Sequence, residues 1–198
     1  MNLGEILNKI KIDDKESFRL NVPNDFYFPD FIIKTLKDNF DPKLEKGGII
    51  SFEYHLLNNN IIFSAKDVTY IPNISKTPNH QYDPDKKELK MAYNDAFSKK
   101  LLPLAFHTHP TVYSDSDDII SEGMNYLKQL NTSIEDKGYT LRDNYEYKGL
   151  KLRFPDILVV ENANAVFVGI YGGLIAPMCF TEQKDKAVKT GIENVFSG

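Results

Sequence analysis

The sequence predicts an α/β or α+β fold in which a central mixed β-sheet is flanked by helices. Strand-like apolar stretches and amphipathic helical stretches are mixed along the chain without strict alternation, which is typical of a sheet with helices on both faces. The composition, with 41% hydrophobic and 26% charged residues, is that of a folded protein. A chain of 198 residues is long enough for one domain with a substantial core.

The N-terminal part is expected to be a short polar helix or arm over residues 1–16, followed by a single domain over residues 17–198. Apolar and polar residues alternate in "SFRLNV", which predicts a short strand over residues 17–22. The segment 25–40 is predicted to be helical after Pro29. One apolar face of that helix is formed by Phe31, Ile32, Leu36 and Phe40.

Two strands, a helix and a third strand are predicted next. Strands over residues 49–57 and 61–72 are separated by three asparagines, which is a hairpin signal. A polar loop leads into an amphipathic helix over residues 84–100. Its apolar stripe consists of Leu89, Tyr93, Ala96 and Phe97. The continuously apolar run "LLPLAFH" over residues 101–107 predicts a strand that is covered on both faces.

The C-terminal half is predicted to begin with a helix over residues 115–130, with Ser114 or Asp115 as its N-cap. Residues 131–154 are polar and aromatic, and we expect a surface excursion or an extra hairpin there. Two strands around an Asn-containing turn are predicted for residues 156–171. A further strand is expected over residues 174–180, and a polar helix at the end of the chain, in "TEQKDKAVKTGIENVF".

Composition argues against several classes of function. A formal net charge of −4 argues against nucleic acid as the main partner, because phosphate binding needs a concentrated basic surface. The N-terminus lacks the apolar core of a signal peptide, and no run reaches the length of a membrane span. The chain is therefore expected to be cytoplasmic without a membrane partner, although export that needs no N-terminal signal stays open. Cys179 is the only cysteine, which excludes intramolecular disulfides and Cys-based zinc sites.

The stretch "LAFHTHPTVYSDSDDII" contains several side chains that can bind a metal or take part in catalysis. His107 and His109 are two positions apart at a predicted strand end, so both imidazoles point to the same side and can share one ion. Two histidines, one carboxylate and a water form a ligand set typical of catalytic zinc. The carboxylate is expected from the first turn of the following helix. Asp115, Asp117 and Asp118 compete for this role, and Asp117 or Asp118 is better placed to reach back.

Taken together, these residues resemble a known family. His107-Thr108-His109-Pro110, followed by Ser114-x-x-Asp117, is similar to the H-x-H-P…S-x-x-D signature of the JAMM (MPN+, JAB-type) metalloproteases. That family carries a glutamate upstream, before a glycine-containing strand entry, and this chain has "LEKGGIISF" with Glu45. The resemblance covers roughly residues 17–180. It implies an MPN/JAB-like sheet with the layering that cytidine deaminases also have.

The resemblance implies a role for each motif residue. His107, His109 and Asp117 would bind Zn²⁺, and water would be the fourth ligand. Glu45 would be the general base, and Ser114 would donate a hydrogen bond to the developing oxyanion.

The loop after the histidines departs from the family pattern. Many family members have about six residues between H-x-H-P and the serine, whereas only Thr111–Tyr113 intervene here. Ser116 is therefore a second candidate, but its S-x-x-D register would end at Ile119, which cannot bind a metal. Ser114 with Asp117 is the self-consistent register, and Asp118 remains an alternative ligand.

The implied activity is hydrolysis of an amide bond in a protein or peptide substrate, including the isopeptide bond or the bond after the C-terminal tail of a ubiquitin-like protein. Residues 131–154 would then be a candidate insertion for substrate recognition. The main alternative is an MPN-type binding or scaffold module without activity. A zinc deaminase is a second alternative, but it needs a Cys-x-x-Cys pair that this chain lacks.

Three further polar residues are predicted to lie away from the site. Glu53 and His55 are about eight residues past the glycine pair and should lie at the far end of their strand. His80 lies in a polar loop and is expected to be solvated.

Overall fold

The computed structural model describes residues 24–57 and 60–109 and a set of strands outside these ranges, and it describes side chains only between residues 26 and 109. The additional strands cover residues 10–13, 17–20, 145–147, 150–152, 156–162, 165–171, 178–183 and 186–191.

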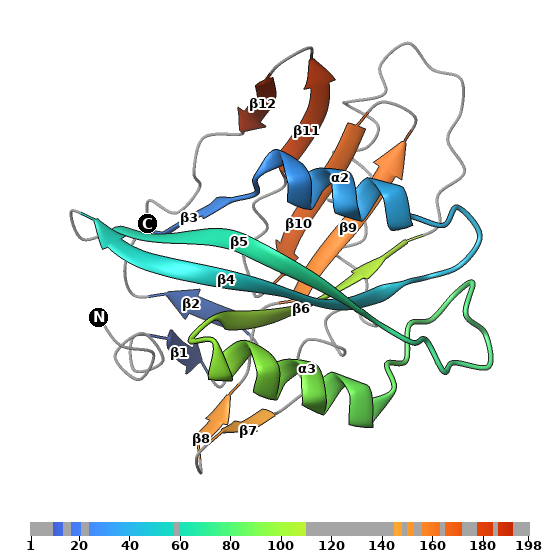
Figure 1. Ribbon diagram of the computed structural model, residues 1–198, viewed down its shortest axis with the longest axis horizontal. Coiled ribbons are helices and arrows are strands. Elements are labelled where there is room, and N and C mark those ends of the chain that lie inside the picture. The colour runs from blue at the N-terminus through green and yellow to red at the C-terminus, as the bar shows by residue number, and fades with distance from the viewer. Residues whose placement is uncertain are drawn as a thin grey trace.

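Among the described residues, an eight-stranded mixed sheet organises the fold (Figure 1). Its strand order is β12-β11-β10-β9-β6-β4-β5-β3. The bounds are β3 (Asn24–Tyr27), β4 (Gly47–Leu57), β5 (Asn60–Ile71), β6 (Leu102–Thr108), β9 (Asp156–Asn162), β10 (Ala165–Tyr171), β11 (Met178–Gln183) and β12 (Lys186–Gly191). β6 is central, because it pairs antiparallel with β4 and parallel with β9.

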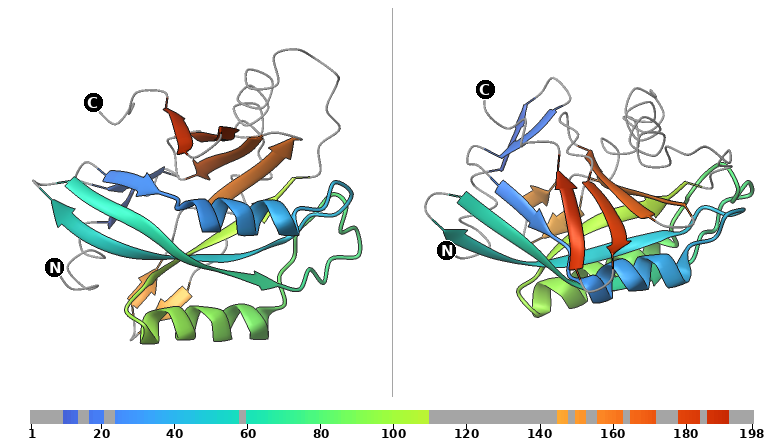
Figure 2. Two further views of the ribbon diagram at one scale, coloured as in Figure 1. Left: turned by 45° about the horizontal axis from the view of Figure 1, so that its top comes forward. Right: turned by 90° about the horizontal axis from the view of Figure 1, so that it is seen from above.

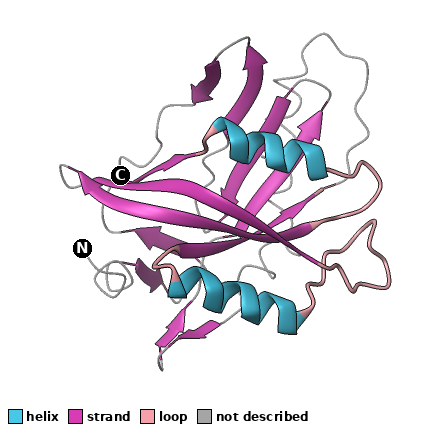
Figure 3. Ribbon diagram, viewed as in Figure 1, coloured by secondary structure: helices cyan, strands magenta, loops and turns pink. Residues whose placement is uncertain are grey.

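Two small antiparallel sheets accompany the large one (Figure 3). The first joins β1 (Ile10–Asp13) to β2 (Ser17–Leu20), and the second joins β7 (Tyr145–Tyr147) to β8 (Leu150–Leu152). β7 and β8 fall within the segment for which the sequence allowed an extra hairpin.

Two helices lie on opposite faces of the strands β4, β5 and β6, as the two views in Figures 1 and 2 show. α2 (Asp30–Asn39) follows Pro29 and buries Ile32 and Leu36, which are one helical turn apart. α3 (Lys86–Ser98) begins at Asp85, whose carboxylate accepts hydrogen bonds from two backbone N–H groups of the first turn, at 2.9 and 3.0 Å. This N-cap satisfies donors that have no partner inside the helix.

The core lies between these helices and the central strands. It is one continuous cluster to which both helices and β4, β5 and β6 contribute. The largest fully buried side chains are Phe52, Phe63, Phe106, Ile32, Leu36, Ile49, Ile50, Ile61 and Leu104. β6 is buried along almost its whole length, which confirms the prediction of a strand covered on both faces.

Most predicted elements within the described residues are present. The strands at 17–22, 49–57, 61–72, 101–107 and 156–171 and both helices before residue 100 are confirmed, with ends that differ by a few residues. Phe31 is an exception to the predicted helix face, because it is 56% exposed. The prediction of a helix over residues 115–130 lies outside the described residues.

The prediction of a polar helix at the end of the chain is wrong. The segment instead contributes the end of β11 and all of β12, which pair antiparallel with Thr181 opposite Val188. The β-branched Val188 and Thr190 suit a pleated strand, and pairing with β11 overrides the polar, lysine-rich composition of the segment. Within residues 1–16, the described part is the strand β1 rather than a helix.

No helix among the described residues is both long enough and apolar enough to cross a bilayer.

Candidate metal centre

The site is built where the start of β4 meets the end of β6. The two strands are antiparallel, and Gly47 is opposite His107. The ladder continues for one more residue pair, since the Thr108 N–H donates to the Lys46 carbonyl at 2.7 Å and the Lys46 N–H donates to Thr108 Oγ1 at 2.9 Å. Glu45 and His109 are the next residues along their two segments. The E-x-G-G and H-x-H segments, far apart in the sequence, are therefore neighbours in space.

His107 and His109 turn their rings toward each other. Their Nε2 atoms are 2.9 Å apart, and the ring centroids are separated by 4.9 Å at an interplanar angle of 45°. Two nitrogens that bind one tetrahedral zinc ion lie roughly 3.3 Å apart, so a small rotation of either ring would open the pair around an ion. The histidine pair thus fits zinc in donor type, and its nitrogen spacing is close to that of a zinc-bound pair.

Burial keeps His107 neutral. Its side chain is 7% exposed, and removal from water, followed by repulsion from His109, lowers its pKa to about 3. A neutral imidazole has a lone pair available for a metal, whereas an imidazolium has none. At neutral pH His107 is therefore ready to bind a cation without first losing a proton.

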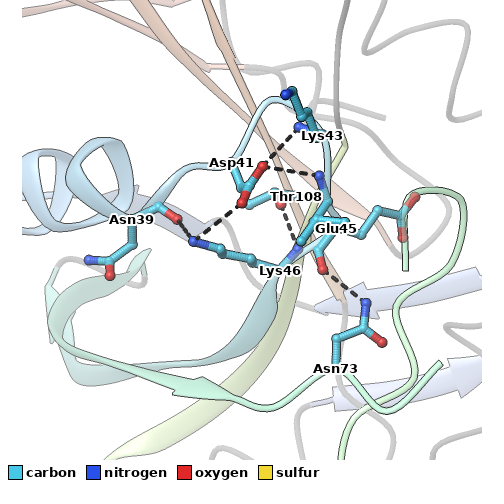
Figure 4. A network of polar contacts seen from close by, with 8 residues as sticks. Asn39, Asp41, Lys43, Glu45, Lys46, Asn73 and Thr108 are labelled. Atoms are coloured by element: carbon cyan, nitrogen blue, oxygen red, sulfur yellow. Dashed lines mark hydrogen bonds and ion pairs between the residues drawn. The ribbon is translucent and has the colours of Figure 1, made fainter. Parts of the chain in front are cut away.

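Glu45 lies on the same side of the sheet as both histidines. Side chains alternate along extended chain, so positions 45 and 47 share a face, and position 47 faces Tyr82 beside His107. Figure 4 shows the side chains of Glu45 and Lys46 leaving the chain in opposite directions. Glu45 is 6% exposed, which places its carboxylate in a largely dry setting.

The two glycines are required by close packing on opposite faces. A Cβ at Gly47 would lie 2.4 Å from the Phe106 carbonyl oxygen and 2.6 Å from Cε1 of Tyr82. A Cβ at Gly48 would lie 1.9 Å from the carbonyl oxygen of Thr69 on β5. Neither position has room for a side chain. The Gly-Gly pair thus lets β4 enter the sheet directly after Glu45 while Tyr82 covers the strand.

No protein-family model matches this chain, and no curated protein shows significant sequence similarity.

Several solved structures overlap with it, and two of them illustrate the low sequence identity of these matches. The protein DSY2949 from Desulfitobacterium hafniense is 13% identical, with a TM-score of 0.46 over 85% of this chain and 91% of that one. The N-terminal domain of STIL from Trichoplax adhaerens is 9% identical, with a TM-score of 0.27 over 80% of this chain and 43% of that one. Overlaps of this quality assign neither family nor function.

The remaining predicted site residues lie outside the described residues. These are Ser114 and Asp117, together with the alternatives Asp115, Ser116 and Asp118. Within the part of the chain that the structure describes, no group of three or more His, Cys, Asp or Glu side chains could hold a metal ion. The structure thus joins the side chains of His107 and His109 and places the segment that carries Glu45 beside the end of β6, and the third protein ligand remains a prediction.

The other polar candidates lie away from the site. Residue 55 is opposite Ile62 on β5, whereas Gly47 is opposite Ile71, so about 26 Å of strand separates His55 from the site. There Glu53 accepts from Lys66 at 2.7 Å and lies 3.4 Å from His55, and these two contacts, Lys66 first, hold the pKa of Glu53 below its usual value. His80 is exposed, as expected for a loop residue.

Sequence reasoning missed two residues that shape the site. Tyr82 stacks its ring parallel to His107, with centroids 6.5 Å apart and an angle of 4°, and its hydroxyl donates to the Ile71 carbonyl at 3.2 Å. Asn73 donates from Nδ2 to the Glu45 carbonyl at 2.9 Å. Both lie in the polar loop between β5 and α3, where composition predicts only solvent exposure. The one available signal was Tyr82, a large aromatic residue within that polar loop.

Proposed function

We propose that this protein is a zinc-dependent metallopeptidase or isopeptidase of the JAMM type. The observation that carries the proposal is the strand register, which pairs Gly47 with His107 and joins Lys46 to Thr108; this register supports a position of Glu45 near the His107 and His109 pair. A buried carboxylate beside two convergent imidazoles is the arrangement that zinc hydrolases use for a base and two ligands.

His107 and His109 would hold the zinc ion, with Asp117 as the third protein ligand according to the sequence resemblance. Bound zinc would supply a Lewis acid that polarises the scissile carbonyl and lowers the pKa of water. Glu45 would accept a proton from the attacking water and then return it to the leaving amine. The Ser114 hydroxyl would donate a hydrogen bond to the oxygen on which negative charge develops.

The proposed substrate is a protein or peptide with an amide bond after a small C-terminal tail, including the tail of a ubiquitin-like protein. The substrate class rests on the resemblance of "LEKGG", "HTHP" and S-x-x-D to the family motifs. No nucleotide-binding glycine loop competes for this assignment in the sequence.

The test is a cleavage screen with matched variants. Wild-type protein, Glu45→Gln and His109→Ala are loaded with zinc and incubated with ubiquitin-like fusions and with fluorogenic peptides that end in Gly-Gly, with and without a chelator. We expect wild-type cleavage that the chelator abolishes, no cleavage by Glu45→Gln at unchanged zinc content, and loss of both zinc and cleavage in His109→Ala. Full activity in Glu45→Gln would remove the proposed base.

The same samples separate the enzyme from a non-catalytic binding module. Elemental analysis after gentle purification should find close to one zinc per chain in the wild type and in Glu45→Gln. Zinc content near zero in the wild type would contradict the enzyme proposal and favour the scaffold alternative.

A further inference from the structure

We propose that Asn73 is a positioning residue that holds Glu45 in register with the histidine pair. This inference rests on the proposed function, because it assigns a partner to the general base. It concerns a residue in the loop between β5 and α3, which none of the sequence motifs includes.

Asn73 uses both ends of its amide. Nδ2 donates to the Glu45 carbonyl at 2.9 Å and to the Gln81 carbonyl at 3.0 Å. Oδ1 accepts from the backbone N–H groups of Ser75 and Asp83, each at 3.0 Å. Such an amide has two donors and an acceptor oxygen with two lone pairs, so these four bonds fill its capacity. A side chain used in this way has one orientation only.

This loop forms hydrogen bonds with both the backbone N–H and the backbone carbonyl of Glu45. Its N–H donates to the Pro78 carbonyl at 2.7 Å, and its carbonyl accepts from Asn73. Figure 4 shows Asn73 directed at the Glu45 carbonyl, while Thr108 and Asn39 engage the neighbouring Lys46. The ladder between β4 and β6 ends at Lys46, so Glu45 lies one residue beyond it. The sheet register brings the chain to this point, and the loop then holds the Glu45 backbone there.

The two ends of the loop are joined by backbone hydrogen bonds that do not involve Glu45, so the loop can hold Glu45 firmly. The Ile74 N–H donates to the Asp83 carbonyl at 2.8 Å, and the Asp85 N–H donates to the Pro72 carbonyl at 3.0 Å. The same loop carries Tyr82, which packs on His107. One segment thus contacts both the base and a metal-ligand candidate. These contacts fix the two groups relative to each other.

The decisive variant is Asn73→Asp. A carboxylate keeps the acceptor for Ser75 and Asp83 but cannot donate to the Glu45 and Gln81 carbonyls. The loop base stays closed, so the protein is expected to fold. Ser75→Ala is the matched control, since it removes an exposed bond from the Thr77 N–H to Ser75 Oγ, at 3.1 Å, that does not touch Glu45. Asn73→Ala is a second variant that adds no charge.

Three quantities are measured on each zinc-loaded protein: amide hydrogen exchange at Lys46 by NMR, zinc content, and steady-state kinetics on the Gly-Gly fluorogenic peptide. The Lys46 N–H belongs to the same peptide group as the Glu45 carbonyl that Asn73 binds, so its exchange reports on that bond. For Asn73→Asp and Asn73→Ala we expect faster exchange at Lys46, unchanged zinc content, and kcat reduced by roughly 10- to 100-fold, since misplacement of a catalytic group by about 1 Å has effects of that size. KM should change by less than about twofold, because Asn73 does not contact substrate in this assignment. Ser75→Ala should match the wild type.

Each contrary outcome has a distinct meaning. Unchanged exchange at Lys46 would show that Asn73 does not hold the peptide group between Glu45 and Lys46. Faster exchange with wild-type kcat would show that the base needs no such support. Either result overturns the inference. A loss of zinc in step with kcat would reveal a general structural role and overturn it as well. If wild type and Glu45→Gln are equally inactive, the proposed function fails, and the positioning role fails with it.

Discussion

The hydroxyl of Thr108 offers the sharpest test of how the E-x-G-G and H-x-H segments are joined. Thr108 lies between His107 and His109 in the sequence and is fully buried. Its Oγ1 accepts a hydrogen bond from the Lys46 N–H at 2.9 Å. Thr108→Val keeps the branched shape and removes the acceptor. The backbone bond from Thr108 to Lys46 is unaffected, so the variant isolates one hydrogen bond between the E-x-G-G and H-x-H segments.

The size of the effect follows from the burial of the donor. A buried N–H that loses its acceptor costs about 1–3 kcal/mol. Lys46 is half-buried, so water can partly replace the hydroxyl, and we expect about 1–2 kcal/mol, in the lower part of that range. For a chain of this length each kcal/mol corresponds to a Tm change of about 2–4 °C, which gives a decrease of roughly 2–8 °C.

The assay is thermal unfolding of the metal-free proteins, followed by amide exchange at Lys46. Thr108→Ser is the control, because it loses a buried methyl group but keeps the acceptor. Both variants should melt below the wild type, the serine variant through a lost methyl contact of about 1 kcal/mol. Only Thr108→Val should expose the Lys46 amide to faster exchange. Wild-type protection of Lys46 in Thr108→Val would refute the coupling described above.

Further predictions concern the packing and the protonation of the same strand ends. Gly47→Ala should destabilise the protein by about 1–3 kcal/mol in urea unfolding, because its Cβ would overlap the Phe106 carbonyl and the Tyr82 ring, and a midpoint equal to that of wild type would contradict this packing. Tyr82→Phe loses one hydrogen bond and should cost about 0.5–1.5 kcal/mol with unchanged zinc affinity. Tyr82→Ala removes the ring from His107 and should weaken zinc binding in a competition titration. The pKa of His107 is lowered in the folded state from 6.5 to about 3, so the unfolded chain binds more protons between those values, and metal-free stability should fall as pH drops through that window. The His107 contribution should approach 1.4 kcal/mol per pH unit, and His107→Gln should have a shallower pH profile than wild type.

Local patterns predicted most of the central elements. Alternation and apolar runs identified β4, β5 and β6, and the apolar stripe of α3 correctly predicted Tyr93, Ala96 and Phe97 as buried. These patterns succeed because burial of one helix face or of both strand faces constrains which residues can occur locally.

The prediction failed where pairing with a distant segment decides the conformation. β12 has a polar, lysine-rich sequence, but six of its residues pair with β11. Phe31 belongs to the apolar set of α2 by spacing, yet it is 56% exposed because the core contacts the helix through Ile32 and Leu36. Propensity describes a segment alone, whereas a sheet partner or a core contact acts from elsewhere in the chain.

For the candidate site, too, some features follow from local sequence patterns and others from the tertiary structure. The sequence by itself determined the chemical inventory, because a histidine pair at i and i+2 of a strand end and a carboxylate before a Gly-Gly pair are local patterns. Only the tertiary structure decided that Lys46 and Thr108, 62 residues apart, are bonded neighbours, so that the segment carrying Glu45 adjoins the segment carrying His107 and His109. It also brought in Asn73 and Tyr82 from a loop without a motif. Register and loop docking are set by long-range hydrogen bonds and close packing, and no single segment of sequence encodes them.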